Sequence, residues 1–561
     1  MALNNPRLLA LIFLALVLAL GGMPFLMGGL YLDKHEGDTI HMADMILRMA
    51  QGEVPHLDFM TPIGIAATAP IALFSHLGLG LGHAFFAGQM LVGLMLLPAV
   101  LWVVHTRIND RAPALVGAVY GGYVLTLCVA LIHGEAFATI SASMYYNRWA
   151  WALAYLIVPL VLMAPGPKSC TRVDGVIIGL AMSALALSKM TYFLAFFPAI
   201  LLALLVRRDW RRMGIAAATG LAVVLLITAL FGTTYWIAYL HDLAVVANSD
   251  LRPKPGGDFS SIMAGPAYFG GTLALLATVI FLRQSGRMVE GLVLLVLMPG
   301  LVYVVYQNFG NDAQWLMLLA MLAFVLRAEA GQTNGFGWHL RQAMTYAAVV
   351  AFALGFASAS NLLISPFRHF VADKEKNSPL LPGSPGNQDI YTLTKRMYDP
   401  RQSVPLVREG GLLAEIRATA MPEDNQSDEA DADEEDEAGN GVTLNGEALA
   451  ECEIQSGIAV LFELVTRDLE RSGYAGSSLI AADILSPYWL FGDFKPAKGG
   501  APWYYGDLSG IKNADYLVVP ICPLSAKYRK SFIELAEKRG YRLQEVRRTE
   551  DYILLTATLP Q

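Results

Sequence analysis

Long apolar runs alternate with short polar connections along the first two thirds of the chain. A helix that crosses a bilayer needs about 20 mostly apolar residues, and the chain is 55% hydrophobic but only 16% charged. The pattern predicts a polytopic α-helical membrane protein with eleven transmembrane helices, the first of them an uncleaved span. The predicted spans are 8–30, 84–105, 112–132, 148–164, 174–189, 191–206, 213–232, 263–282, 288–306, 313–327 and 342–362.

The connections between these spans fall into a basic set and a polar set. Lys and Arg are enriched in cytoplasmic loops, so we expect the basic connections to share the cytoplasmic side with Arg7 and the N-terminus. This assignment requires that Pro62–Gly78 lies on the outer surface without crossing, and it places the C-terminal part outside. The basic connections contain His105–Arg111, Lys168 and Arg172, Arg207–Arg212, Arg283 and Arg287, and Arg327–Arg341.

The first outer loop, residues 31–83, gathers acidic residues and histidines between two apolar regions. Charge near lipid is costly and marks candidate functional sites. The apolar period predicts an amphipathic helix over Asp38–Gln51 that lies along the membrane surface, with Asp38 as N-cap and Gly52 as C-cap. Its polar face is predicted to carry His41, Asp44, Arg48 and Gln51, with Asp44 and Arg48 paired at i,i+4.

After Ser365 the composition becomes that of a soluble protein. Residues 365–451 are predicted to form a linker in which the acidic segment 422–441 is disordered. Residues 452–561 are predicted to form an α/β domain outside the membrane. Its expected elements are helices at 454–471 and 527–538, strands at 478–484 and 514–520, and an edge hairpin at 541–547 and 552–558.

Charge and cysteine content exclude several classes of protein. The formal net charge of −7 includes ten acidic residues in Glu423–Glu437, so the rest of the chain carries +3. No basic domain is present, and we expect no nucleic-acid partner. The four cysteines show no zinc spacing, but Cys452 and Cys522 share the external domain and are predicted to form a disulfide. A divalent metal at the loop histidines His35, His41 and His56 is possible but not indicated, because ligand spacing is absent.

The layout of the first loop resembles that of the GT-C superfamily of integral membrane glycosyltransferases. This superfamily includes the protein O-mannosyltransferases and the bacterial aminoarabinose transferases that modify lipid A. The resemblance rests on Glu36-Gly-Asp38, then Gly52-Glu-Val-Pro55-His-Leu-Asp58-Phe59, then Thr61-Pro62-Ile-Gly64. The usual Asp-Glu pair is replaced by Glu-Gly-Asp, and by spacing to Pro55 we expect Asp38 to be the catalytic acid, with Glu36 as the alternative.

The resemblance implies a catalytic domain over residues 1–364 that transfers a sugar from a polyprenyl-phosphate donor. The acceptor is an envelope glycan, lipid or protein on the periplasmic face of a bacterial inner membrane. A carboxylate is needed to activate the acceptor hydroxyl, and cations are needed to hold the donor phosphate. Asp38 is the candidate base, a helix N-cap being its other interpretation, and Asp58 is expected to brace the loop.

Lys189 and Arg148 are the candidate phosphate ligands. Lys189 interrupts the apolar stretch 176–206, and it either binds phosphate or snorkels to the interface. Arg148 follows Tyr146 and Asn147 at the head of a span, and its other interpretation is an interfacial anchor. A sugar pocket or a helix cap is expected from Asn308, Asn311, Asp312 and Gln314, with Trp315.

Other interpretations remain open. The aromatic segments Pro487–Phe494 and Pro502–Gly506 either bind an acceptor glycan or form a packed core, which we favour. A lipid-linked sugar flippase or transporter would share the polytopic layout, but it would more often show discontinuous helices or paired halves. A polysaccharide ligase or polymerase would need a larger acceptor loop than Tyr235–Met263.

Overall fold

The computed structural model describes residues 3, 5–132, 138–251, 258–311, 313–398, 400–402, 411–412 and 441–559. The chain divides into two compact units, each assembled from separate segments. The first, here called the helical unit, comprises Met1–His35, Pro62–Ile237 and Pro253–Ala372. The second, here called the α/β unit, comprises Glu36–Thr61, Ala238–Arg252 and Asp373–Gln561. The middle of the first loop therefore belongs to the same unit as the C-terminal domain.

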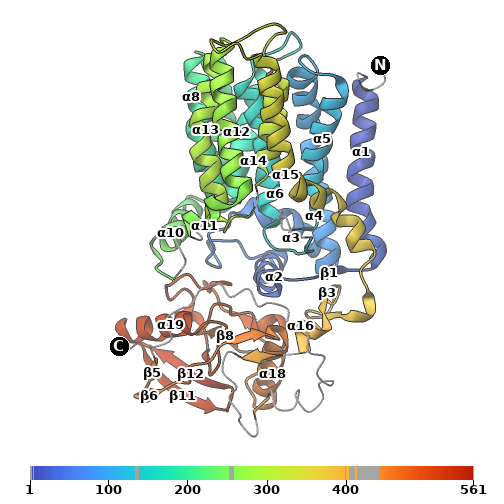
Figure 1. Ribbon diagram of the computed structural model, residues 1–561. Coiled ribbons are helices and arrows are strands. Elements are labelled where there is room, and N and C mark those ends of the chain that lie inside the picture. Colours follow the sequence, from blue (N-terminus) through green and yellow to red (C-terminus); the bar gives the residue numbers. More distant parts are fainter. Residues whose placement is uncertain are drawn as a thin grey trace. The chain divides into compact units, whose positions relative to one another are not determined.

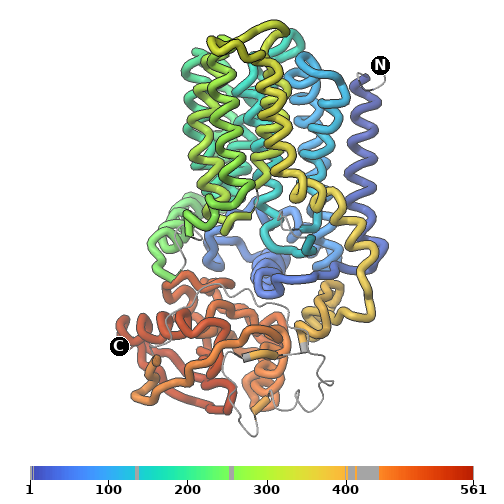
Figure 2. The backbone as a smooth tube through the Cα atoms, in the orientation of Figure 1, coloured from blue at the N-terminus to red at the C-terminus, as the bar shows by residue number. Residues whose placement is uncertain are grey.

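Every predicted span coincides with a helix of the helical unit, and Figures 1 and 2 show these helices side by side. Seven of the helices in the described residues are long and apolar enough to cross a membrane, so the chain is a polytopic helical membrane protein. The helices that coincide with the spans are α1 (Pro6–Gly22), α4 (Leu81–Val103), α5 (Ala114–Val129), α6 (Tyr145–Leu162), α7 (Thr171–Ser188), α8 (Met190–Val206), α9 (Trp210–Phe231), α12 (Pro266–Gln284), α13 (Met288–Gln307), α14 (Trp315–Val325) and α15 (Leu340–Phe370).

Shorter elements complete this unit. They are η2 (Met23–Met27), β1 (Leu30–Leu32), α3 (Ile65–His76), the π-helical turn η3 (Val104–Ile108), and α11 (Phe259–Ala264). Helix α10 (Thr234–Asn248) begins in the helical unit and continues into the α/β unit.

Small residues let the helices approach closely and reveal their direction. A Cβ added to Gly175 of α7 would lie 2.8 Å from Ile215 of α9, and one added to Gly179 would lie 2.7 Å from Thr219. Small residues at helix interfaces are typical of membrane bundles. Residue numbers increase in the same direction along the two contacting faces, so α7 and α9 are parallel. Helix α8, which connects them, runs in the opposite direction.

The basic connections gather at one end of the bundle, here called the basic end. Arg111 donates to the carbonyl of Ala164 at 2.6 Å, and Arg287 donates to that of Leu326 at 3.1 Å. Together with three ion pairs between neighbouring loops, these hydrogen bonds confirm that the five predicted basic loops share one end. The linking ion pairs are Arg107–Asp174, Arg212–Asp174 at 3.4 Å and Arg207–Glu290 at 2.9 Å.

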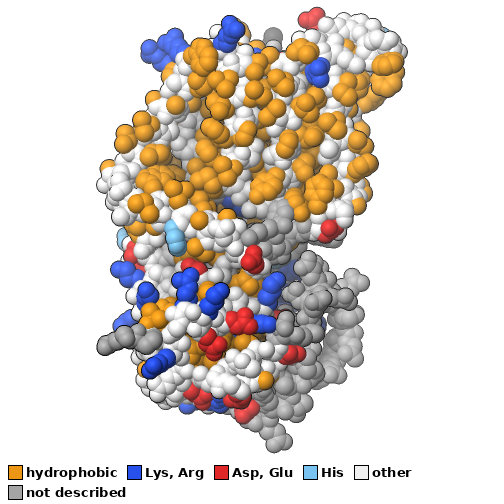
Figure 3. Space-filling view, turned by 90° about the vertical axis from the view of Figure 1, so that its left-hand side faces the viewer, with side chains coloured by type: hydrophobic (Ala, Val, Ile, Leu, Met, Phe, Trp, Pro, Cys, Tyr) orange, Lys and Arg blue, Asp and Glu red, His pale blue; other side chains and the backbone are white. Residues whose placement is uncertain are grey.

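Figure 3 shows Lys and Arg side chains at the upper end of the bundle, with a broad hydrophobic surface below them. A hydrophobic belt beside a cationic rim is the surface expected of a bundle embedded in a bilayer. The bundle thus has two chemically different ends, one basic and one polar.

Helix α3 has 12 residues, which corresponds to about 18 Å, well short of the roughly 30 Å of a hydrocarbon core. Its start lies at the end of the bundle away from the basic connections. Gly64 N–H donates to the Ser188 carbonyl at 3.0 Å, and Tyr145 O–H donates to that of Ala67 at 2.9 Å. Length alone does not decide the matter, because α14, one of the predicted spans, has only 11 residues. That Pro62–Gly78 does not cross stays a prediction.

The predicted domain boundary at Ser365 is wrong, because α15 continues to Phe370 and the helical unit to Ala372. The polar residues that suggested a soluble segment are buried inside this unit. Ser365 Oγ accepts from Leu131 N–H at 2.9 Å, and His369 Nε2 accepts from Tyr31 N–H at 3.1 Å. Helix α15 therefore continues beyond the apolar run 342–362, because its polar side chains find hydrogen-bond partners inside the helical unit.

The α/β unit is built on a five-stranded sheet in the order β11-β12-β10-β8-β9. Strands β8 and β9 run parallel to their neighbours, while β12 pairs antiparallel with both β10 and β11, with a bulge between Glu545 and Arg547. The predicted hairpin is confirmed, although only its β11 arm lies at the edge. The elements are β8 (Ser478–Ala481), β9 (Lys495–Pro496), β10 (Tyr516–Pro520), β11 (Arg542–Arg548), β12 (Tyr552–Thr558), α18 (Ile458–Arg471) and α19 (Ala526–Lys538).

The predicted linker 365–451 is partly folded, which corrects that expectation. It contains η4 (Lys374–Lys376), β2 (Asn377–Pro379), β3 (Ile390–Leu393), α16 (Thr394–Tyr398), β4 (Arg401–Gln402), β5 (Thr443–Leu444) and β6 (Glu447–Ala448). The acidic segment 422–441 lies outside the described residues except for Gly441.

Helix α18 starts at Ile458 and not at 454. Residues Ile454–Ser456 form strand β7, which pairs with β4, and Gly457 at φ +78° makes the turn into the helix. The remaining elements of this unit are α2 (Glu36–Ala50), η5 (Tyr488–Leu490) and η6 (Ile511–Asn513).

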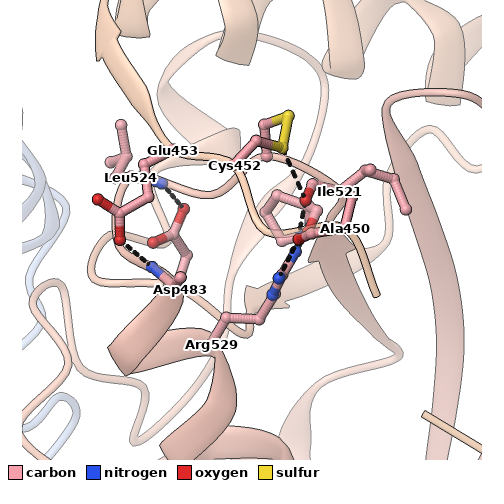
Figure 4. The surroundings of a disulfide bond; sticks show 10 residues. Ala450, Cys452, Glu453, Asp483, Ile521, Leu524 and Arg529 are labelled. Atoms are coloured by element: carbon pink, nitrogen blue, oxygen red, sulfur yellow. Dashed lines mark hydrogen bonds between the residues drawn. A yellow bond between two sulfur atoms is a disulfide. The ribbon is translucent and has the colours of Figure 1, made fainter. Parts of the chain in front are cut away.

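The predicted disulfide between Cys452 and Cys522 is confirmed, with Cα atoms 4.9 Å apart. Figure 4 shows it beside Arg529, which donates to the carbonyl oxygens of Ala450 and Ile521. The disulfide therefore joins the segment before β7 to the segment after β10. Beside it, the carbonyls of Ala450, Pro520 and Ile521 all accept from the Arg529 guanidinium.

Candidate functional site

The acid-bearing helix of the first loop begins two residues earlier than predicted. Helix α2 covers Glu36–Ala50, so Asp38 is its third residue and not its N-cap. Asp38 is half-buried in the first turn, where a negative charge interacts favourably with the helix dipole. The N-cap interpretation of Asp38 is therefore wrong.

Glu36 is held by residues that the sequence did not connect with the loop. Its Oε1 accepts from Arg396 Nε at 2.6 Å and from Thr392 Oγ1 at 2.9 Å, and its Oε2 accepts from Arg396 at 3.1 Å. A bidentate guanidinium–carboxylate pair is strong and geometrically specific. This pairing explains why the helix starts at Glu36 and favours an anchoring role for that carboxylate.

The pair Asp44–Arg48 is confirmed at 2.5 Å, and the polar face that carries it is buried. The two side chains are 1% and 3% exposed. Trp489 Nε1 donates to Asp44 Oδ2 at 2.9 Å, and Arg48 donates to the carbonyl of Ala497 at 3.2 Å. The polar face predicted from periodicity is thus covered by residues 487–497.

His41 follows the same pattern, with its ring centroid 5.3 Å from that of Trp503. In the segments 487–494 and 502–506, Tyr488, Phe491, Tyr504 and Tyr505 are buried, which favours the packed-core interpretation. Trp489 and Trp503, by contrast, contact α2. The aromatic composition marked these segments as notable in the sequence, but it did not show that α2 is what they contact.

The loop after α2 is braced as predicted for Asp58. Its Oδ2 accepts from Val54 N–H at 2.9 Å. His56 Nδ1 lies 2.9 Å from Asp242 Oδ2, which also accepts from Thr61 N–H at 3.1 Å. Asp242 was missed, and its only signal is that it is an acid within a largely apolar stretch. Among the residues that the structure describes, no group of three or more His, Cys, Asp or Glu could hold a metal ion.

Lys189 occupies the single-residue turn between α7 and α8, at the end of the bundle opposite the basic end. Its Nζ donates to Asn308 Oδ1 at 2.7 Å and to Asn147 Oδ1 at 3.1 Å. The rings of Tyr146 and Tyr192 lie 5.5 and 5.8 Å away. These five residues are here called the Lys189 cluster.

The cluster unites four predicted site residues from distant parts of the chain, namely Lys189, Asn147, Tyr146 and Asn308. Tyr192 was missed, although its position three residues after Lys189, at the start of α8, is a usable signal. Amide oxygens and aromatic faces attract an ammonium group through dipoles and quadrupoles. These four neighbours are neutral, and they orient the ammonium of Lys189 through amide oxygens and aromatic faces.

Arg148 is placed elsewhere by its hydrogen bonds. It is fully buried and donates to the carbonyls of Ile132 and Ala130, the latter at 2.6 Å. Ala130 is the C-cap residue that directly follows α5. Because the last carbonyls of a helix lack intrahelical partners, Arg148 has a sufficient structural role without a phosphate.

The other residues of the predicted sugar pocket do not gather at one place in the described residues. Asn311 is half-buried, and its N–H donates to the carbonyl of Asn308 at 2.9 Å. Asp312 lies outside the described residues. Gln314 accepts from Tyr123 O–H and donates to Ser358 Oγ at 2.9 Å. Of the predicted sugar pocket, the described contacts bring only Asn308 to Lys189.

Comparison of the chain with protein-family models, with curated proteins and with solved structures finds no match.

Proposed function

We propose that this chain is a membrane glycosyltransferase that takes its sugar from a polyprenyl-phosphate donor. The observation that carries the proposal is the Lys189 cluster, in which neutral groups hold an ammonium at a turn between two apolar helices. A fixed cation in a poorly hydrated region stabilises the phosphate that leaves as the sugar is transferred. The surrounding apolar helices supply the contact surface that a polyprenyl tail requires.

Asp38 is the proposed general base, which accepts the proton of the acceptor hydroxyl as that oxygen attacks the sugar carbon. Two features of the α/β unit support the choice of Asp38 over Glu36. Arg396 and Thr392 hold Glu36 in an anchoring role, and Asp38 is the half-buried acid that lies beside it in the same helical turn. The acceptor remains an envelope glycan, lipid or protein.

We further propose eleven crossings of a bacterial inner membrane, with the basic end in the cytoplasm and residues 373–561 in the periplasm. The clustering of the basic connections supports this orientation through the positive-inside tendency. The Cys452–Cys522 disulfide supports it as well, because disulfides persist in the periplasm and not in the cytosol.

The direct test uses the purified chain in nanodiscs with radiolabelled polyprenyl-phosphate sugar, and envelope extract as the source of acceptor. Release of polyprenyl phosphate, together with label in a new product, is the expected result. A parallel assay in sealed vesicles follows the donor across the bilayer. Movement of uncleaved donor without release identifies a flippase and contradicts the proposal.

A further inference from the structure

Helix α2 is fixed at three levels by the C-terminal part of the α/β unit. Arg396 and Thr392 hold Glu36 in its first turn. The indole N–H of Trp489 holds Asp44 in its middle, and the carbonyl of Ala497 accepts from Arg48 near its end. These contacts are polar and directional, and they point at the charged groups of one helix.

Two of the held groups are charged and nearly inaccessible to solvent. The side chains of Asp44 and Arg48 are 1% and 3% exposed. A buried ion pair is sustained only when additional hydrogen bonds satisfy its remaining polar atoms, and removal of a partner is strongly destabilising. Trp489 and Ala497 supply such bonds, so the conformation of α2 depends on the segment 487–497.

The contact at Glu36 bears directly on the orientation of Asp38. The two acids are separated by one glycine in the same helical turn. The Arg396 guanidinium, which binds both oxygens of Glu36, therefore also fixes the backbone from which Asp38 projects. A rigid supporting shell of this kind is what holds a catalytic group in a productive geometry.

We infer that Arg396 and Trp489 are positioning residues, which hold α2 so that Asp38 keeps one orientation. The inference rests on the proposed function of Asp38 as a general base. The C-terminal part of the unit then acts as the scaffold of the acid-bearing helix.

The first test is amide hydrogen exchange of peptides from 36–50 in the purified full-length chain. Arg396→Ala removes the fork on Glu36, while Trp489→Phe keeps an aromatic ring and removes only the N–H donor. We expect exchange in α2 to become at least about tenfold faster in Arg396→Ala, and less so in Trp489→Phe. Arg548→Ala is the control, since it breaks an exposed pair with Glu545 in the same unit.

The second test is turnover of the labelled donor. We expect Arg396→Ala to lower kcat with little change in donor KM. Arg396→Lys should restore part of kcat, because a lysine at this position still places a positive charge beside the Glu36 carboxylate. A general loss of stability would not give this split. Unchanged exchange in both Arg396→Ala and Trp489→Phe overturns the inference.

Faster exchange with undiminished kcat also overturns it, while leaving the proposed transferase intact. If the wild-type chain turns over no donor, the proposed function fails, and the positioning role of Arg396 and Trp489 fails with it. The exchange data then report only that the C-terminal part holds α2.

Discussion

The Nζ of Lys189 lies 2.7 Å from the Oδ1 of Asn308, although 119 residues separate the two along the chain. Asn147 contributes a second amide oxygen to the same ammonium. The start of α6, the turn between α7 and α8 and the end of α13 are therefore tied together at one cation. Such convergence gives the polar end of the bundle a defined chemical centre.

Lys189→Met should weaken donor binding while leaving the bundle folded. Methionine keeps an unbranched apolar stem but cannot donate to the donor phosphate, and a hydrogen bond to a charged group contributes about 1.5–3 kcal/mol. We expect a loss of affinity of roughly 10- to 100-fold, measured by titration with polyprenyl-phosphate sugar in nanodiscs. Lys168→Met, at the basic end, is the matched control, and equal affinities in the two variants would refute the assignment.

Asp38→Asn should abolish most turnover with little effect on folding. Asn preserves size and polarity but cannot accept a proton, and general-base help is worth about 10²–10⁴-fold in rate. Donor affinity and melting temperature should stay close to those of the parent. Glu36→Gln should instead lower the melting temperature, since it weakens the pair with Arg396. Should Glu36→Gln lose turnover at unchanged stability while Asp38→Asn remains active, the base is Glu36.

Arg148→Ala should destabilise the chain more than it affects donor affinity. The substitution leaves the carbonyls of Ala130 and Ile132 without their guanidinium partner, and an unsatisfied buried group costs about 1–3 kcal/mol. Melting in detergent, followed by intrinsic fluorescence, measures the first effect, and donor titration measures the second. An unchanged melting temperature with lost donor binding would restore Arg148 as a phosphate ligand.

A reporter that fluoresces only in the cytoplasm should be dark when it is fused after Gln561. The expectation follows from eleven crossings with the basic end inside. The same reporter inserted at the 163–170 connection should be bright, which controls for expression. A bright C-terminal fusion contradicts the proposed topology.

Asp483 should make stability depend on pH. Its carboxylate accepts from Leu524, Ile484 and Ser525 N–H groups, yet burial dominates and raises its pKa from 3.8 to about 7. The folded chain therefore binds this proton more tightly than the unfolded chain does. The contribution of Asp483 is fully present below about pH 4 and is lost as pH rises through about 7.

We therefore expect the melting temperature of the wild type, relative to Asp483→Asn, to fall as the pH rises from about 4 to about 7. Each unit of pKa difference corresponds to about 1.4 kcal/mol. A difference between the two proteins that stays constant over this range would show that Asp483 is ionised throughout.

Hydropathy was sufficient to locate the bundle helices, because an apolar run of such length has few alternatives to a membrane helix. Lys189 was identifiable for the same reason, as a charge in an apolar stretch. The cysteine pair was predictable because the other two thiols, Cys128 and Cys170, lie in or beside the spans. These features are local or depend on composition.

The features that were missed depend on contacts between distant residues. Periodicity placed Asp44 and Arg48 on a polar face, but it could not show that Trp489 covers that face. The start of α2 was misplaced because Asp38 is a good N-cap by type, while the residue that decides the matter is Arg396. Arg148 was ambiguous, since an arginine that caps carbonyls and one that binds phosphate look alike in sequence.

The partners of α2 are synthesised long after α2 itself. Glu36 and Arg396 are separated by 360 residues, and Asp44 and Trp489 by 445. At about 5–20 residues per second, Trp489 is added roughly 20–90 s after Asp44. During that interval the first loop is a nascent segment whose acids and aromatic-facing side chains lack their final neighbours. Biogenesis of this protein therefore includes an interval in which the helix that carries Asp38 exists without the residues that hold it in the folded chain.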